Sequence, residues 1–331
     1  MNDHLIAFIK SEYGLSVSGL RPLSGGYVHD VWRAASDRGP IVVKRYQSVD
    51  PKQLQKSLEL QQAACTAGLP VPTVFANLKG QLATKTAHGW VTVQDRLDGA
   101  HRDPAHITPA VAASVGRTLG RVHRMLAEIP PPKIPIAPPS ADKIRADSED
   151  WLNRLRAVSN PDEWDRMAAN EAEYRLRALS SHAIDPARYA IDVPQWIHGD
   201  FYPANLLFDE QDRVVAVLDW DFATYRHRGV EVARAAFEFA RTGGGSLVRS
   251  RFDSFLSAYA GEASLSAAQR AVMFHQFFHH QLSVLYPLVL RRSPGAHLPK
   301  EWQALARRRF EVVRDIERNL DLMTEWASML A

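Results

Sequence analysis

The segment with the most chemically informative residues runs from 198 to 221. It reads His-Gly-Asp-Phe-Tyr-Pro-Ala-Asn over 198–205, and Asp-Trp-Asp follows at 219–221. Phosphoryl transfer to an alcohol needs one carboxylate that orients and deprotonates the hydroxyl. It also needs an amide oxygen and a second carboxylate that hold magnesium. Asp200, Asn205 and Asp219 have the side chains for these three tasks.

Apolar runs on both sides of the motif predict how these side chains are held. We expect strands at 195–197, 206–208 and 214–218, with a turn at 209–212. The last two strands form a hairpin that brings Asn205 close to Asp219. Both residues then lie at strand ends, where loops carry chemistry.

The pattern of His198, Gly199, Asp200 and Asn205, a hairpin and then Asp219 resembles the catalytic segment of the aminoglycoside phosphotransferase superfamily. That superfamily includes choline kinase, fructosamine kinase and one type of homoserine kinase. The resemblance implies an α+β fold similar to that of eukaryotic protein kinases, with a small antiparallel-sheet lobe and a larger, mainly helical lobe. It implies that Asp200 is the catalytic base and that Asn205 and Asp219 are magnesium ligands. Gly199 replaces the Arg of the protein-kinase pattern, so we expect no control by phosphorylation.

The N-terminal part predicts a nucleotide site in the order that the resemblance implies. Ser24, Gly25 and Gly26 form a turn between expected strands at 17–22 and 28–34. Paired glycines let backbone N–H groups approach phosphate oxygens without obstruction by a Cβ. An apolar strand over 41–43 then ends at Lys44, which resembles the kinase Lys that contacts the α- and β-phosphates of ATP.

A helix is expected over 51–67, because Pro51 at its start and Gly68 just past its end are typical helix boundaries. Glu59 is the only acidic residue in that helix. We therefore predict that Glu59 forms an ion pair with Lys44. A buried strand at 90–94 leads into a segment that resembles the hinge between the lobes. There the carbonyl of Asp95 and the N–H of Leu97 would meet the adenine edge.

The hinge divides the chain into an expected nucleotide-binding lobe at 1–97 and a catalytic and substrate-binding lobe at 98–331. Beyond the hinge the pattern is helical, with a proline-rich connector at 129–139. Helices are expected at 108–127, 141–158, 161–181, 229–241, 246–259, 266–290 and 300–326. Pro287 should end or kink the helix that contains it. A helical insertion at about 128–190 helps to wall the substrate site in related enzymes.

The composition limits the other classes of function. The chain of 331 residues has a formal charge of +3 and no basic stripe interleaved with aromatics, which argues against nucleic-acid binding. The single cysteine, Cys65, excludes an internal disulfide and a cysteine-based zinc cluster. We find no signal peptide and no apolar run long enough for a membrane span, so a cytoplasmic location is expected. The oligomeric state stays open.

The sequence leaves the acceptor open among an amino alcohol, a hydroxy amino acid such as homoserine, and a sugar or aminoglycoside. Residues 222–331 hold fifteen Arg or Lys against ten Asp or Glu. Because like charges repel, we expect polycationic aminoglycosides to be poor acceptors. The His-rich stretch that contains His275, His279 and His280 predicts either a core helix with hydrogen-bonded histidines or a polar surface at the substrate.

Two other functions compete with an ATP- and Mg²⁺-dependent kinase. His198, Asp200, Asp219 and Asp221 could form the metal cluster of a hydrolase, but that hypothesis leaves Lys44 and the Gly25–Gly26 turn unexplained. The second competing function is that of a catalytically inactive nucleotide-binding module. The joint presence of Lys44, Asp200, Asn205 and Asp219 argues against it.

Overall fold

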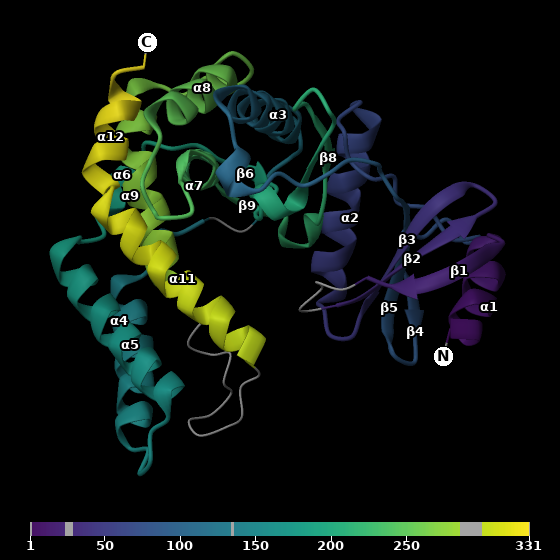
Figure 1. Ribbon diagram of the computed structural model, residues 1–331, viewed down its shortest axis with the longest axis horizontal. Helices are drawn as coiled ribbons and strands as arrows, with labels where there is room; N and C mark the ends of the chain where they lie inside the picture. Colours follow the sequence, from purple (N-terminus) through teal and green to yellow (C-terminus); the bar gives the residue numbers. More distant parts are fainter. Residues whose placement is uncertain (1, 24–28, 134–135, 285–299, 331) are drawn as a thin grey trace.

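The computed structural model describes residues 2–23, 29–133, 136–284 and 300–330. A small part built around a sheet lies beside a larger, mainly helical part (Figure 1). This arrangement confirms the predicted α+β organisation. The predicted glycine turn, with Ser24, Gly25 and Gly26, lies outside the described residues. The division between 97 and 98 stays a prediction.

The smaller part contains a five-stranded antiparallel sheet with the order β1-β2-β3-β5-β4. Its strands are β1 (Val17–Pro22), β2 (Asp30–Ser36), β3 (Gly39–Tyr46), β4 (Thr84–Thr86) and β5 (Gly89–Asp95). Helix α1 (Asn2–Tyr13) packs Ile9 and Tyr13 against a core that includes Ile41 and Val43 of β3. β3, which carries Lys44, is the central strand of the sheet and pairs with β2 on one side and β5 on the other.

Helix α2 (Pro51–Thr66) connects the two parts of the molecule. The Asp50 side chain caps it by accepting a hydrogen bond from the Lys52 N–H, and Pro51 occupies its first turn. Leu54 and Leu58 pack in a cluster with Tyr46 of the sheet. The other end of the same helix contributes Leu60 and Ala64 to the core of the helical part. α2 therefore packs against both parts of the molecule.

The helical part surrounds a large core of aromatic and aliphatic side chains. Its helices are α3 (Pro109–Ala127), α4 (Ala141–Arg156), α5 (Glu163–Ser181), α6 (Pro186–Tyr189), α7 (Arg228–Ala240), α8 (Arg249–Ala260), α9 (Ala267–Ser283), α11 (Lys300–Arg318) and α12 (Leu320–Ser328). α3 and α8 approach closely because Gly116 has no side chain. A Cβ there would lie 2.1 Å from the backbone oxygen of Phe255. α4, α5 and α6 lie in the region of the predicted insertion.

Two short antiparallel ribbons carry the catalytic segment. β6 (Pro194–Ile197) pairs with β9 (Thr224–His227), and β7 (Leu206–Phe208) pairs with β8 (Val214–Val217). The β7–β8 ribbon confirms the predicted hairpin. Among the described residues, short 3-10 helices lie at Pro104–His106, Pro203–Asn205 and Trp220–Phe222.

The structure differs from the predicted elements in several places. The sequence analysis missed α1, α6, β4 and β9, which are short or lack a clear apolar period. The helix expected over 300–326 is two helices, because α11 ends before Asn319 and α12 begins after it. The predicted helix over 266–290 ends at Ser283, and Pro287 lies outside the described residues. Within the described part of the chain, no helix is both long and apolar enough to cross a membrane.

Candidate active site

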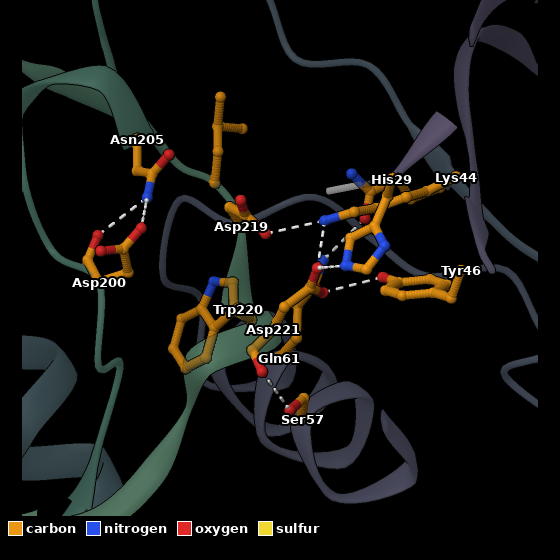
Figure 2. Close-up of polar contacts among 12 residues, drawn as sticks. His29, Lys44, Tyr46, Ser57, Gln61, Asp200, Asn205, Asp219, Trp220 and Asp221 are labelled. Atoms are coloured by element: carbon orange, nitrogen blue, oxygen red, sulfur yellow. Dashed lines mark hydrogen bonds and ion pairs between the residues drawn. The ribbon is translucent and has the colours of Figure 1, made fainter. Parts of the chain in front are cut away.

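Asp200 is held from two sides. One of its carboxylate oxygens accepts a hydrogen bond of 2.8 Å from the Arg234 guanidinium on α7. The other accepts a bond of 2.9 Å from the Asn205 side-chain amide, which also donates to the backbone oxygen of Asp200 (Figure 2). The Arg234 side chain is mostly buried. Burial alone would lower the Arg234 pKa, but Asp200 and Glu238 raise it above its usual value. The charged pair therefore fixes the direction of the Asp200 carboxylate.

The loop before Asp200 is fixed by the buried Glu231 carboxylate. Glu231 accepts hydrogen bonds from the backbone N–H groups of His198, at 3.0 Å, and Gly199, at 2.5 Å. A Cβ at Gly199 would lie 2.0 Å from the Phe222 carbonyl oxygen, and its φ of +82° is in the left-handed region. Glycine is required there on both grounds.

His198 has a structural role. Its Nε2 lies 2.9 Å from the Leu218 carbonyl oxygen, and its Nδ1 accepts a hydrogen bond from the Asp200 N–H. The ring is fully buried. Because both ring nitrogens are used by backbone groups, His198 joins the loop before Asp200 to the strand before Asp219 and is not free to ligate a metal.

Asn205 and Asp219 lie at neighbouring ends of the β7–β8 hairpin, as the sequence predicts. The Leu218 N–H donates to the Asn205 carbonyl oxygen at 2.8 Å. Asp219 has φ 57° and ψ 70°, a left-handed conformation that is uncommon outside glycine. Strained backbone of this kind clusters at functional sites, because the surrounding structure must hold it in place.

Lys44 of β3 reaches across to the far side of this hairpin. Its ammonium group forms ion pairs with Asp219, at 2.8 Å, and with Asp221 (Figure 2). Burial alone would lower the Lys44 pKa, but Tyr46, Asp221 and Asp219 raise it above its usual value. Burial raises the pKa of Asp219, but Lys44 lowers it more, so that its net pKa falls below the usual range. Lys44 is therefore a charged group beside a charged carboxylate.

The Asp221 carboxylate contacts three side chains, those of Lys44, Tyr46 and His29. Besides Lys44, it accepts a hydrogen bond of 2.8 Å from the Tyr46 hydroxyl, and the His29 Nε2 lies 3.5 Å from it. Burial raises the pKa of Asp221 above the usual range. The Lys44 charge acts against this shift, and the Asp219 charge adds to it. Asp221 thus connects the sheet to the catalytic segment through Lys44 and Tyr46 of β3.

The predicted ion pair between Lys44 and Glu59 is wrong for this structure. The Glu59 carboxylate is exposed and lies 3.6 Å from Lys56 and 3.1 Å from the Gln55 amide. The reason is the direction of α2. Its face toward the site carries Ser57, whose hydroxyl lies 3.4 Å from the Asp221 carbonyl oxygen (Figure 2). Glu59 instead contacts Lys56 and Gln55 of its own helix.

The segment predicted to be the hinge begins at the end of β5. The Asp95 N–H donates to the Thr73 carbonyl oxygen at 3.0 Å, and its carboxylate accepts a 2.6 Å bond from the Thr73 N–H. Leu97 is half-buried at the start of the loop that follows β5. The contacts of Asp95 and Leu97 with adenine stay predictions.

The residues that are present fit a hard divalent cation. The Asn205 amide nitrogen is turned to Asp200, so its oxygen points to the Asp219 side in Figure 2. An amide oxygen and a carboxylate are ligands of the type that Mg²⁺ takes. The described residues contain no group of three or more His, Cys, Asp or Glu side chains that could hold a metal. The hydrolase hypothesis therefore gains no support, since it needs such a cluster.

Sequence reasoning missed Arg234, Glu231, Tyr46 and His29. Glu231 and Arg234 lie three residues apart on α7 and therefore share the helix face that meets the catalytic loop. That spacing was available as a signal, but a charged pair on a helix is more often solvated. Tyr46 follows Lys44 by two residues on β3, so both side chains point to the same face of the sheet.

Comparison with known proteins agrees with this geometry. Residues 19–267 match the model of the phosphotransferase enzyme family, APH. A homoserine kinase from Polaromonas naphthalenivorans (strain CJ2) is 23% identical over 275 residues, which cover 82% of this chain and 81% of that protein.

Solved structures show the same fold at low sequence identity. An aminoglycoside phosphotransferase from Alicyclobacillus acidocaldarius has a TM-score of 0.65 at 14% identity, covering 97% of this chain and 95% of its own. Choline kinase from Cryptosporidium parvum has a TM-score of 0.64 at 10% identity, covering 98% of both chains. An amicoumacin kinase in complex with AMP-PNP and Ca²⁺ has a TM-score of 0.64 at 14% identity, covering 95% of this chain and 93% of its own.

These likenesses confirm the predicted kinase-like fold. The family match covers well over half of the chain and includes Lys44, Asp200, Asn205 and Asp219. The chain belongs to the phosphotransferase enzyme family, and it is a small-molecule kinase with an alcohol group as its acceptor.

Proposed function

We propose that this protein transfers the γ-phosphate of ATP to a hydroxyl of a small molecule, which is an amino alcohol, a hydroxy amino acid or a sugar. The observation that carries the proposal is the double restraint on Asp200 by Arg234 and Asn205. A carboxylate held in one direction beside a metal-ligand pair is what transfer to an alcohol requires.

The chemistry of transfer assigns a task to each group. The acceptor hydroxyl donates a hydrogen bond to Asp200, and its oxygen forms a bond to the γ-phosphorus. The bond from that phosphorus to the bridging oxygen breaks, so the products are a phosphate ester and ADP. Asp200 takes the hydroxyl proton late, because the transition state is loose. No covalent intermediate on the protein is needed.

The nucleotide side of the proposal rests on Lys44. Its ammonium group is positioned by Asp219 and Asp221, and it would contact the phosphates of ATP. Asn205 and Asp219 would hold Mg²⁺, which neutralises phosphate charge when it is bound. Ser24, Gly25 and Gly26 are proposed to cover the phosphates. Asp95 and Leu97 are proposed to meet the adenine through their backbone groups. A cytoplasmic location stays a prediction.

A screen of ATP consumption against a library of hydroxyl compounds tests this function. We expect ADP formation that depends on both Mg²⁺ and one class of acceptor, with a phosphate ester as the second product. Formation of ADP and inorganic phosphate at one rate with every compound, or with none added, would contradict kinase activity. The matched control is a variant of Asp200, because loss of the base should stop acceptor-dependent turnover.

A further inference from the structure

A cavity lies on the outer face of the five-stranded sheet, away from the catalytic segment. α1 packs on this face of the sheet and α2 packs on the other, so the sheet lies between the two helices (Figure 1). The cavity has a volume of about 670 Å³ and is bounded by α1, β2, β3 and the turn between β4 and β5. Cavities of roughly 300–1,000 Å³ are the size that small-molecule ligands occupy.

Arg45 of β3 supplies a cation to this cavity. Side chains alternate along a strand, so Arg45 faces the cavity while Lys44 and Tyr46 face the active site. The Arg45 guanidinium lies 5.1 Å from the centre of the Trp32 ring. Its Nε and Nη2 donate to one oxygen of Asp30, at 3.0 and 2.7 Å. These contacts fix the plane of the guanidinium, and its Nη1 forms no hydrogen bond with any described residue.

Apolar side chains line the cavity from two sides. Leu5 and Phe8 of α1 are half-buried there, and Trp32 and Val91 belong to the sheet. None of the described residues that line the cavity is acidic. The cavity therefore combines a cation with an apolar wall and offers no anion. This combination fits a ligand that has an anionic group and an apolar body, because the wall gains from being covered and the cation gains a partner.

The turn between β4 and β5 forms a fixed part of the cavity wall. The Thr86 hydroxyl donates to the Gly89 carbonyl oxygen at 2.9 Å and accepts a hydrogen bond of 3.1 Å from the His88 N–H. Gly89 has φ +116°, and a Cβ there would lie 1.9 Å from the Tyr46 carbonyl oxygen. The turn is thus packed closely against the end of β3, and its side of the cavity is formed without a bound ligand.

We propose that this cavity binds a small carboxylic acid with an apolar body, at a site separate from those of the nucleotide and the acceptor. The carboxylate accepts a hydrogen bond from Arg45 Nη1, whose direction is set by the contacts of Arg45 with Asp30 and Trp32. The apolar body lies against Phe8 and Val91. Binding at this site does not depend on kinase activity, because none of its groups belongs to the active site.

The test compares matched pairs of compounds by calorimetric titration. Phenylacetate, hexanoate and indole-3-acetate are titrated beside phenylacetamide, hexanamide and indole-3-acetamide, which keep the shape but lack the charge. AMP-PNP and magnesium are present throughout, to occupy the proposed nucleotide site. We expect at least one acid to bind with a Kd below about 1 mM and at least about fivefold tighter than its amide, because a charged acceptor strengthens the hydrogen bond from Arg45.

Variants of Arg45 test the charged contact. Arg45→Gln should weaken binding of the acid roughly tenfold and that of the amide less. Asp30 keeps a partner in this variant, because Gln47 donates to it at 2.9 Å. Arg45→Lys keeps the charge without the planar fork, so its affinity should lie between those of the Gln variant and the wild type. Arg38→Gln is the matched control and should bind the acid as the wild type does, because Arg38 is exposed at the other end of the β2–β3 hairpin.

Two further variants test the cavity without changing its charge. Ala87→Phe adds a ring at an exposed position of the wall and should weaken the acid at least about tenfold by filling space that the ligand needs. Ala76→Phe adds the same ring at an exposed position outside the cavity and should have no effect. Asp200→Ala should also bind the acid normally. Three results overturn the proposal: no binding by any acid, equal binding of acid and amide, or an affinity that falls in Asp200→Ala but not in Ala87→Phe.

Discussion

Lys44 and Asp219 form an ion pair of 2.8 Å although 175 positions separate them in the chain. This contact joins the central strand of the sheet to the end of the β7–β8 hairpin, and it places a cation beside a predicted magnesium ligand. When a nucleotide binds, Lys44 would contact its phosphates and Asp219 would bind the metal, so each charge of the ion pair would gain a new partner. The ion pair therefore positions both side chains without a bound nucleotide.

The magnesium assignment predicts different effects for its two ligands. Asp219→Asn removes the charge while Asn tolerates the left-handed backbone, so it should weaken Mg·ATP binding by at least about tenfold. Asn205→Ala should weaken binding less, since it removes a neutral ligand. It should still lower kcat, because Asn205 also holds Asp200. Calorimetric titration of ATP with and without magnesium separates the two. An unchanged magnesium dependence in Asp219→Asn would place the metal elsewhere.

Arg234 is predicted to be a positioning residue for Asp200. Arg234→Gln should lower kcat roughly 100-fold, because a misdirected base loses the geometry of attack. KM for ATP should stay within a few-fold, since Arg234 contacts no residue of the nucleotide side. Arg234→Lys should recover part of the activity by keeping the charge beside Asp200. Equal loss of kcat and of thermal stability in both variants would instead indicate a purely structural role.

Gly199 should be intolerant of any side chain. Gly199→Ala adds a steric clash with the Phe222 carbonyl to the left-handed φ, so we expect a loss of stability of more than about 2 kcal/mol. Gly39→Ala is the matched control, because Gly39 has φ +101° but nothing within 4 Å of its Cβ position. Chemical denaturation of both variants measures the difference. Similar losses would show that backbone strain alone decides.

His279 should make the stability of the fold depend on pH. Burial, His275 and other neighbours lower the His279 pKa to about 4, below its unfolded value near 6.5. A depressed histidine pKa means that the unfolded chain binds the proton more readily, so stability falls as pH drops below about 6.5. The loss is roughly 2 kcal/mol at pH 5. His279→Gln should flatten this part of the stability curve, measured by denaturation from pH 7 to 5. An unchanged slope would contradict the assignment.

The sequence predicted the elements that have clear local signals. α2 was expected from a proline at its start and a glycine just past its end, and α3 from a proline at its start and an apolar helical period. The hairpin was expected from two apolar runs around a polar turn. Asp200, Asn205 and Asp219 were found because their order follows a family pattern. Asn205 contacts Asp200 and is joined to Leu218, the residue before Asp219, and the roles of the three side chains stay predictions.

Other parts could not be predicted because they depend on contacts between distant residues. Glu59 was chosen as the partner of Lys44 by elimination within one helix, but the helix direction decides which side chain faces the site. Arg234 contacts Asp200 only because α7 packs beside the catalytic loop. Asp221 contacts Lys44 only because β3 lies beside the catalytic segment.

The most direct test of the account is product analysis with the Asp200 variant. Wild-type protein and Asp200→Ala are incubated with ATP, magnesium and the acceptor found by the screen, and phosphate esters are followed by ³¹P NMR. We predict a new phosphate-ester resonance for the wild type and a rate about 10²- to 10⁴-fold lower for Asp200→Ala, with ATP affinity nearly unchanged. Ester formation at the wild-type rate in Asp200→Ala would contradict the central claim that Asp200 is the catalytic base.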